Sequence, residues 1–219
     1  MELELAGARL RLLPQRAAFL PAEDLLLVAD AHIGKAASFR RLGVPVPQGT
    51  TTETLDRLDA LLEATGARRL AFLGDFLHSA HARAPATWAA VHGWRRRRAA
   101  LELVLVRGNH DRHAGDPPPD WRLHCVDEPW RVGPWALVHH PAPVAGAYVL
   151  AGHLHPAVRL GGRGARAQDR LRLPCFHFGP AVGVLPAFGA FTGQHVVRPA
   201  PGDRVFVVHG DAVRALPVA

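Results

Sequence analysis

The chain has 219 residues, of which 48% are hydrophobic, and carries a formal net charge of +7 at pH 7. This length suits one large domain with a substantial core, so we expect residues 1–219 to form a single domain. The longest apolar runs are far too short to span a membrane, and the acidic N-terminus, with Glu2 and Glu4, does not resemble a signal peptide. We therefore expect a cytoplasmic protein that does not associate with membranes.

The basic charge, with a pI of about 11, is compatible with a polyanionic substrate such as nucleic acid. It does not establish one, because Lys35 is the single lysine among 26 basic residues, which indicates a compositional bias toward arginine. Cys125 and Cys175 form neither a CxxC pair nor a disulfide framework. The 14 histidines are more informative, since many of them fall in short motifs.

The first half of the chain predicts alternating strands and helices. Four apolar runs predict strands, at 10–13 (as an edge strand), 25–29, 69–73 and 103–106. One helix is predicted from a capping box at Thr50–Glu53 to Gly66. A second is predicted over 85–100, where the arginines at 95–98 would complement the helix dipole. The segment 40–49 is rich in Pro and Gly and predicts a loop.

The second half of the chain predicts mostly strands. They are expected at 135–138, 147–151, 170–178 and 204–208, with an irregular stretch at 189–202. A β-α-β-α-β half followed by further strands predicts an α/β (α+β) fold with one mixed core. We expect a four-layer αββα sandwich, in which two mixed β-sheets are flanked by helices.

Five of the predicted strands end in side chains that commonly bind metals. These pairs are Asp30 with His32, Asp75 with His78, Asn109 with His110, His139 with His140, and His153 with His155. Single pairs of this kind are common in turns, whereas five at successive strand ends indicate one shared site. A mixture of carboxylate, imidazole and amide ligands suits Mn²⁺, Fe²⁺ or Zn²⁺ rather than Ca²⁺ or Mg²⁺. The set is too large for one tetrahedral ion and about right for two.

The spacing within two of these pairs predicts that their side chains point the same way. Residues at i and i+2 of an extended segment share a face, so Asp30 should lie beside His32, and His153 beside His155. Asn109 is the only asparagine in the chain, in a composition that disfavours amides, which indicates a specific role.

In this order, the strand-end motifs resemble the calcineurin-like metallophosphoesterase superfamily, over about residues 30 to 155. They are Asp30-x-His32, Gly74-Asp75, Gly108-Asn109-His110-Asp111, a lone His139, and Gly152-His153-x-His155. The resemblance implies two divalent metal ions, with Asp75 as a bridging ligand. It implies that the first ion is held by Asp30, His32, Asp75 and His155, and the second by Asn109, His139 and His153 together with Asp75. The role of His140 stays ambiguous.

Two metal ions held in this way predict hydrolysis of phosphate esters. Such a pair can activate a bridging hydroxide as the nucleophile and clamp a phosphate for in-line attack. His110 cannot face the metals if Asn109 does, so it is free to act as the general acid. Asp111 is expected to hydrogen-bond to the His110 imidazole and orient it. We expect Mn²⁺ as the metal, with Fe²⁺ or Zn²⁺ as alternatives.

A narrower resemblance covers nearly the whole chain. The segments 29–35, 43–47, 74–78 and 185–189 together are similar to the ligase-associated DNA-damage-response metallophosphoesterases. This implies a DNA phosphodiesterase or endonuclease in DNA repair, in functional association with a DNA ligase and a set of helicase and nuclease repair proteins. By likeness to double-strand-break repair nucleases, His78 is expected to assist phosphate binding.

Three basic residues follow the first metal motif and are candidates for contacting the substrate. These are Lys35, Arg40 and Arg41, for each of which a solvated surface position is the alternative. Two other functions stay open: a phosphatase or phosphodiesterase for nucleotides or other small phosphoesters, and a non-catalytic scaffold of the same fold. The presence of every expected ligand and of His110 argues against the scaffold. The sequence does not predict the oligomeric state.

Overall fold

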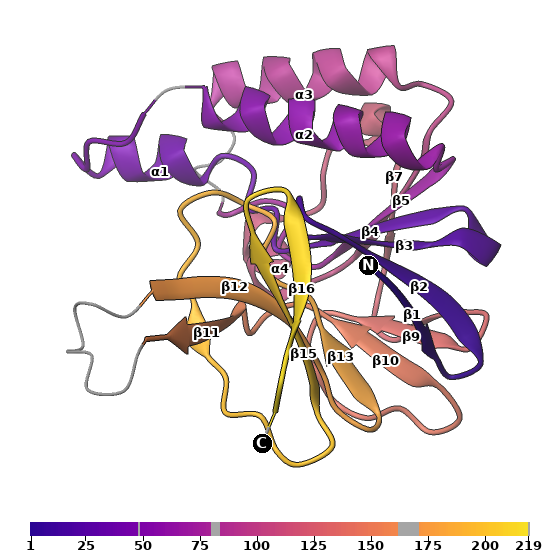
Figure 1. The fold of residues 1–219 in the computed structure, drawn as a ribbon. Helices are drawn as coiled ribbons and strands as arrows, with labels where there is room; N and C mark the ends of the chain where they lie inside the picture. Colours follow the sequence, from indigo (N-terminus) through magenta and orange to yellow (C-terminus); the bar gives the residue numbers. More distant parts are fainter. Residues whose placement is uncertain (48, 80–83, 162–170, 219) are drawn as a thin grey trace.

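The structure is a computed structural model that describes residues 1–47, 49–79, 84–161 and 171–218. Two mixed β-sheets pack face to face, and helices α2 and α3 cover the outer face of the first sheet (Figure 1). The first sheet has seven strands in chain order: β1 (Glu2–Leu5), β2 (Ala8–Leu13), β3 (Ala17–Leu20), β4 (Leu25–Ala29), β5 (Arg69–Leu73), β6 (Glu102–Val106) and β7 (Leu123–Val126). Neighbouring strands are antiparallel from β1 to β4 and parallel from β4 to β7.

The second sheet has nine strands, in the order β14-β11-β12-β13-β10-β9-β8, and β15 joins it by pairing with β12 and β16. Their bounds are β8 (Trp130–Val132), β9 (Trp135–Val138), β10 (Tyr148–Ala151), β11 (Pro156–Leu160), β12 (Leu171–Phe178), β13 (Val182–Val184), β14 (His195–Val196), β15 (Arg204–His209) and β16 (Ala212–Leu216). Strands β9 and β10 run parallel, so their carboxyl ends lie at the same edge of the sheet.

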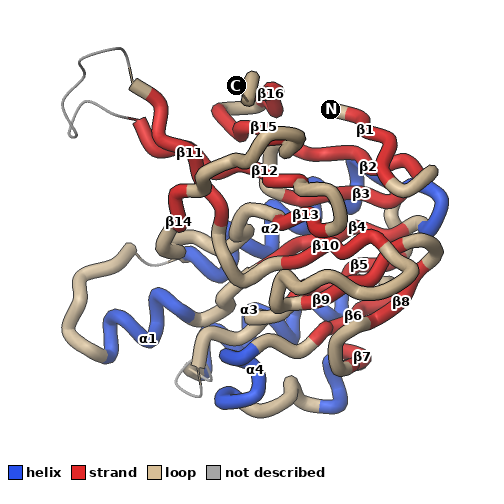
Figure 2. The backbone as a smooth tube through the Cα atoms, turned by 90° about the horizontal axis from the view of Figure 1, so that it is seen from below, coloured by secondary structure: helices blue, strands red, loops and turns tan. Residues whose placement is uncertain are grey.

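The described α-helices are α1 (Lys35–Arg41), α2 (Thr50–Thr65), α3 (Pro85–Arg97) and α4 (Asn109–Ala114). Short 3-10 turns occur at η1 (Pro21–Glu23) and η3 (Pro119–Trp121). Viewed from below, the second sheet lies in front of α2 and α3 (Figure 2). None of the helices in the described part of the chain has the length and apolar character needed to cross a membrane.

Strand β4 shows how the core is organised, because all five of its residues are buried. Leu26 and Val28 belong to the layer between the first sheet and the helices, whereas Leu25 and Leu27 belong to the layer between the two sheets. A strand covered on both faces has a continuous apolar sequence, and each fully buried Leu contributes about 1.5–3 kcal/mol. This burial fixes the position of the carboxyl end of β4, after which the polar residues begin.

The expected fold, two mixed sheets flanked by helices, is confirmed, and the strands predicted at 25–29, 69–73 and 135–138 match β4, β5 and β9. The strand predicted at 10–13 is not at the edge, because β1 pairs along its outer side. The capping box predicted at Thr50–Glu53 is wrong, since the N-cap of α2 is Gly49, with no side-chain cap.

Three further boundaries differ from the prediction. Arg40 and Arg41 form the last turn of α1 and not a loop. The helix predicted over 85–100 ends at Arg97. The strand predicted at 170–178 is described from Leu171 onward, and residue 170 lies outside the described residues.

Candidate dinuclear metal centre

The carboxyl ends of five strands meet where the two sheets adjoin. Strands β4, β5 and β6 of the first sheet are parallel neighbours, as are β9 and β10 of the second. An isolated bridge between Ala29 and Ala187 connects the end of β4 to the segment that follows β13. Each strand delivers a predicted ligand within three residues of its end: Asp30 after β4, Asp75 after β5, Asn109 after β6, His139 after β9 and His153 after β10.

Asp30, His32 and His155 form the first ligand set, and their potential ligand atoms all lie within 4.8 Å of one another. His155 Nε2 is 3.5 Å from Asp30 Oδ1, and His32 Nε2 is 3.9 Å from Asp75 Oδ2. His155 Nδ1 lies 2.9 Å from the Gly193 carbonyl oxygen, so a proton on Nδ1 leaves Nε2 free to face Asp30. The sequence-predicted members of this set are therefore brought together.

Asn109, His139 and His153 form the second ligand set around the other oxygen of Asp75. His139 Nε2 is 3.5 Å from Asp75 Oδ1, 2.9 Å from Asn109 Oδ1 and 3.1 Å from His153 Nδ1. On the opposite side of its ring, His139 Nδ1 is 3.1 Å from the Leu73 carbonyl oxygen. A proton on Nδ1 therefore leaves Nε2 as a ligand atom. The two oxygens of Asp75 face different ligand sets, Oδ2 the first and Oδ1 the second, as a bridging carboxylate requires.

The chemistry of these donors fits a pair of divalent cations. Asp30 and His139 are fully buried, and Asp75 is nearly so. Buried carboxylates cost several kcal/mol unless a positive charge compensates them. The buried Nδ1 of His32 has no hydrogen-bond partner among the described residues. Burial lowers the pKa of His32 to about 2, with repulsion from Lys35 as a smaller cause, so its imidazole is in the neutral form that binds metals.

Five of the predicted ligands have left-handed backbone conformations. Their φ angles are 53° at Asp30, 45° at His32, 50° at Asp75, 71° at His153 and 49° at His155. For residues other than glycine this conformation costs about 1–2 kcal/mol each, and it persists only where the surroundings enforce it. The expectation that Asp30 and His32, or His153 and His155, share a face of an extended segment is therefore wrong. Asp30 and His32 nevertheless meet in one ligand set, whereas His153 and His155 belong to different sets.

Glycines precede three of the ligands because the loops approach each other too closely for a side chain. A Cβ atom at Gly108 would lie 2.4 Å from Asp75 Oδ1. A Cβ atom at Gly152 would lie 2.7 Å from the Leu73 carbonyl oxygen and 2.8 Å from Asp30 Oδ2. The glycines of the sequence motifs are thus required by contacts between separate strand ends and not by the turns alone.

Three imidazoles, those of His32, His78 and His110, form a further cluster beside the ligand sets. The rings of His78 and His110 stack with centroids 5.1 Å apart, and His110 Nε2 is 3.9 Å from Asp75 Oδ2. The His110 side chain is 39% exposed, so a substrate can reach it. Burial lowers the pKa of His78 to about 4, with the charges of Lys35 and His110 as smaller causes.

Asp111 does not hold the His110 ring as predicted. Its two oxygens accept the backbone N–H groups of Leu77, at 3.1 Å, and Gly108, at 2.9 Å. His110 Nδ1 lies instead 2.6 Å from the His78 carbonyl oxygen. Asp111 therefore fastens the loops after β5 and β6 to each other. Burial raises its pKa to about 6, although the two N–H groups act in the opposite direction.

Glu128 is a residue of the site that the sequence did not indicate. One of its oxygens accepts the N–H groups of His139, at 2.7 Å, and His140, at 2.9 Å, and the other lies 2.7 Å from His140 Nδ1. Burial alone would raise the pKa of Glu128, but these hydrogen bonds outweigh it and lower the pKa. No motif marks Glu128, because its partners belong to another strand end. Its contact explains the position of His140 beside the second ligand set.

The three predicted substrate-binding residues lie on α1, at different distances from the ligands. Lys35 is partly buried, and burial lowers its pKa while the charges of Asp75 and Asp30 oppose that change. Arg40 is exposed and donates hydrogen bonds to the carbonyl oxygens of Val46 and Pro47, at 3.4 and 2.8 Å. Arg41 is also exposed. The structure therefore brings Lys35 close to the predicted ligands Asp30 and Asp75, whereas Arg40 is bonded to the loop that follows α1.

The chain matches no protein-family model and no curated protein sequence. Among solved structures, the nuclease MPE of Pseudomonas putida is 47% identical over 99% of both chains, with a TM-score of 0.87. The chain belongs to the metallophosphoesterase family. The predicted resemblance is thereby confirmed, and the protein is a metal-dependent hydrolase of phosphate esters. Yfce, a phosphoesterase of E. coli, is 18% identical over 86% of this chain and 90% of that chain. Its TM-score of 0.40 is too low for that similarity to support any conclusion.

Proposed function

We propose that the protein is a dinuclear-metal nuclease that hydrolyses phosphodiester bonds in DNA. The observation that carries the proposal is Asp75, whose two oxygens each face one ligand set. The full-length similarity to a nuclease supports a nucleic acid as the substrate. Residues 1–219 act in this proposal as one domain, because the ligands come from both sheets.

The proposal assigns two divalent cations to the site, most simply Mn²⁺, with Fe²⁺ or Zn²⁺ as alternatives that metal analysis distinguishes. Asp30, His32 and His155 would hold one cation, Asn109, His139 and His153 the other, and Asp75 both. When bound, such a pair lowers the pKa of a water molecule and neutralises charge on a phosphate.

The remaining groups of the site have roles set by where they lie. His110 directs Nε2 toward Asp75 while the His78 carbonyl oxygen fixes its other nitrogen, which supports His110 as the group that protonates the leaving oxygen. Lys35 and the imidazole of His78 would contact a phosphate oxygen in this proposal. Asp111 acts through the backbone, by holding the loop that carries Asn109 and His110.

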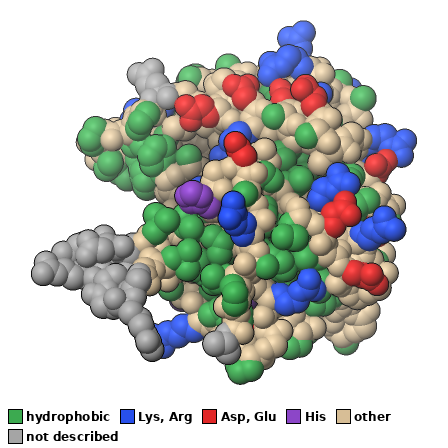
Figure 3. Space-filling model, viewed as in Figure 1, with side chains coloured by type: hydrophobic (Ala, Val, Ile, Leu, Met, Phe, Trp, Pro, Cys, Tyr) green, Lys and Arg blue, Asp and Glu red, His purple; other side chains and the backbone are tan. Residues whose placement is uncertain are grey.

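A long substrate requires a metal site that opens onto the surface. Figure 3 shows the surface hollowed below α1, with an exposed histidine side chain at the inner end of the hollow. The test is cleavage of plasmid and single-stranded DNA, and of bis-p-nitrophenyl phosphate, with a panel of divalent metals. Cleavage of DNA that EDTA abolishes and Mn²⁺ restores is expected. Hydrolysis of the small ester without any cleavage of DNA would favour a nucleotide or small-phosphoester substrate instead.

A place in DNA repair beside a DNA ligase is supported by the family resemblance, and a cytoplasmic location is proposed with it. Survival of a strain lacking the gene, measured after DNA damage, tests that place independently of the chemistry. Unchanged survival would leave the nuclease without this role.

A further inference from the structure

Phe191 is an exposed aromatic residue that the packing of the protein does not explain. The residue is 48% exposed. Its φ angle is +57°, in the left-handed region that disfavours any residue with a Cβ. Glycine or asparagine would suit this position better. A strained, exposed phenylalanine beside an active site indicates a ligand that contacts the ring.

The segment that carries Phe191 ties the first ligand loop to the last ligand. The N–H groups of Phe188 and Gly189 donate to the carbonyl oxygens of Ala29 and Asp30, at 2.8 and 3.1 Å. Two residues beyond Phe191, the Gly193 carbonyl oxygen lies 2.9 Å from His155 Nδ1. Phe191 therefore lies between two segments that are each fastened to a metal ligand, and its position relative to the site is well defined.

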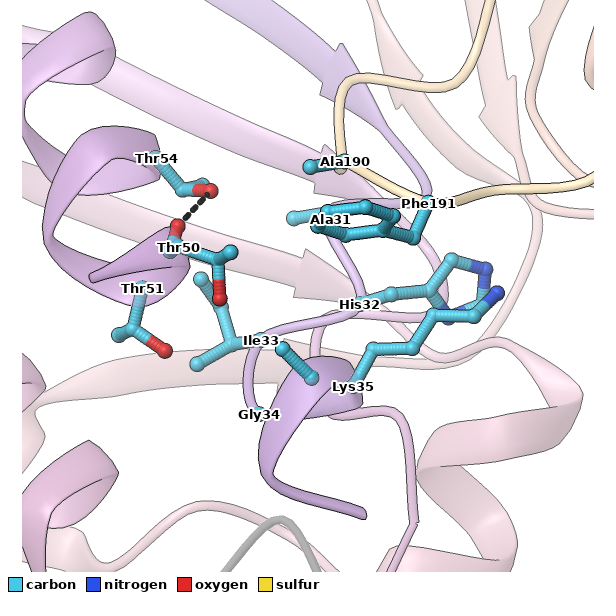
Figure 4. Close-up of a pocket in the computed structure, with 11 residues that line it drawn as sticks. Ala31, His32, Ile33, Gly34, Lys35, Thr50, Thr51, Thr54, Ala190 and Phe191 are labelled. Atoms are coloured by element: carbon cyan, nitrogen blue, oxygen red, sulfur yellow. Dashed lines mark hydrogen bonds between the residues drawn. The ribbon is translucent and has the colours of Figure 1, made fainter. Parts of the chain in front are cut away.

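The ring of Phe191 lies on the wall shared with the metal site. It lines a small cavity together with His32 and Lys35, whose side chains extend side by side next to it (Figure 4). That cavity has a volume of about 10 Å³, enough for no more than one water molecule. A ligand group of any size must therefore lie against the exposed face of the ring and cannot enter the cavity.

We propose that Phe191 is a stacking platform for a nucleobase next to the scissile phosphate. This inference rests on the proposed function, because it supplies the residue that binds the base of a nucleic-acid substrate. Every base has a π-face, so stacking adds affinity without selecting a sequence. Lys35 on the other side of His32 would neutralise the phosphate of the same nucleotide, which explains why an ammonium and an aromatic ring flank one metal ligand.

Two phosphodiesters with the same leaving group test the platform: thymidine 5′-(p-nitrophenyl phosphate), which carries a base, and methyl p-nitrophenyl phosphate, which does not. Phe191→Ala should lower kcat/KM for the thymidine ester and for single-stranded DNA about 10- to 100-fold, mainly through KM. The methyl ester should change less than about twofold. Phe191→Trp should retain activity, whereas Phe191→Leu, which keeps the apolar bulk without the π-face, should behave like Phe191→Ala.

The thermal midpoint separates a binding role from a structural one. Phe191→Ala should leave it unchanged, and Phe191→Gly should keep or raise it, because the left-handed backbone is relieved. Leu171→Ala, at a residue that is 53% exposed on β12, is the matched control and should leave both esters unchanged.

Equal losses on both esters, or no loss on either, would overturn the platform while leaving the nuclease intact. Failure of the unmodified enzyme to cleave any DNA would instead overturn the proposed function.

Discussion

Glu128 should control the second ligand set separately from the first. Its carboxylate accepts the N–H groups of His139 and His140 through one oxygen and meets the His140 ring through the other. Glu128→Ala removes all three interactions and leaves the N–H of the fully buried His139 without its acceptor. An unsatisfied buried donor costs about 1–3 kcal/mol, so the free energy of unfolding should fall by about 2 kcal/mol.

The effect on metal binding should be larger for one ion than for the other. Removing a group that orients a ligand typically weakens metal affinity about 10- to 100-fold. Titration of the metal-free variant with Mn²⁺, followed by calorimetry, should therefore show one site weakened by this factor and one site nearly unchanged. The unaffected site should be the one formed by Asp30, His32 and His155, because none of its described hydrogen bonds involves Glu128.

Two control variants make this reasoning refutable. Glu128→Gln keeps an oxygen for the two N–H groups and should restore most of the affinity and stability. Glu63→Ala removes an exposed glutamate that pairs only with Arg98, at 2.9 Å among the described contacts, and should change neither metal site. Equal weakening of both sites by Glu128→Ala, or no rescue by glutamine, would show that Glu128 does not act through His139.

Four other changes have directions that follow from the geometry. Asp75→Asn should lower the occupancy of both ions in metal analysis, since each of its oxygens faces one ligand set; one stoichiometric ion in the metal-replete wild type would contradict this. His110→Ala should keep the metals but reduce turnover of DNA about 10²–10⁴-fold, with a smaller reduction for p-nitrophenyl esters, which need little protonation; equal reductions on both substrates would exclude the acid role. In the metal-free protein, burial lowers the folded-state pKa of His32 to about 2, so below its ordinary pKa of 6.5 only the unfolded chain takes up this proton. The free energy of unfolding should therefore decrease as the pH is lowered from about 6.5 to 2, by up to about 1.4 kcal/mol per pH unit. The denaturant midpoint of His32→Asn should depend less steeply on pH, and a pH dependence equal to that of the wild type would argue against this cause. Arg40→Ala combined with Arg41→Ala should weaken DNA binding and leave hydrolysis of a small diester unaffected. The slope of the logarithm of the binding constant against the logarithm of the salt concentration should become less steep by up to about 0.7–0.9 for each phosphate that is no longer neutralised. An unchanged slope would show that this end of α1 does not bind DNA.

The sequence by itself determined which residues could bind metal and where the strands that carry them end. Strands β4, β5 and β9 are continuous apolar runs, buried on both faces, and each stops at a polar motif. Burial on both faces leaves little choice of residue, so the run and its end are visible locally. The identity of Asp30, Asp75 and the histidines as one constellation follows from the order of these ends along the chain.

Only the tertiary structure decided how these side chains are held. The left-handed backbone at Asp30, the attachment of Asp111 to Leu77, and the support of His139 by Glu128 all depend on which loop lies beside which. The position of Phe191 beside the site could not be predicted from the sequence, because hydrogen bonds to loops from other strands hold the segment that carries it. Hydrophobic periodicity is a local property, because neighbouring residues in the sequence encode it. The partner of a hydrogen bond depends instead on how distant segments pack, because any donor or acceptor that lies nearby can satisfy a polar group.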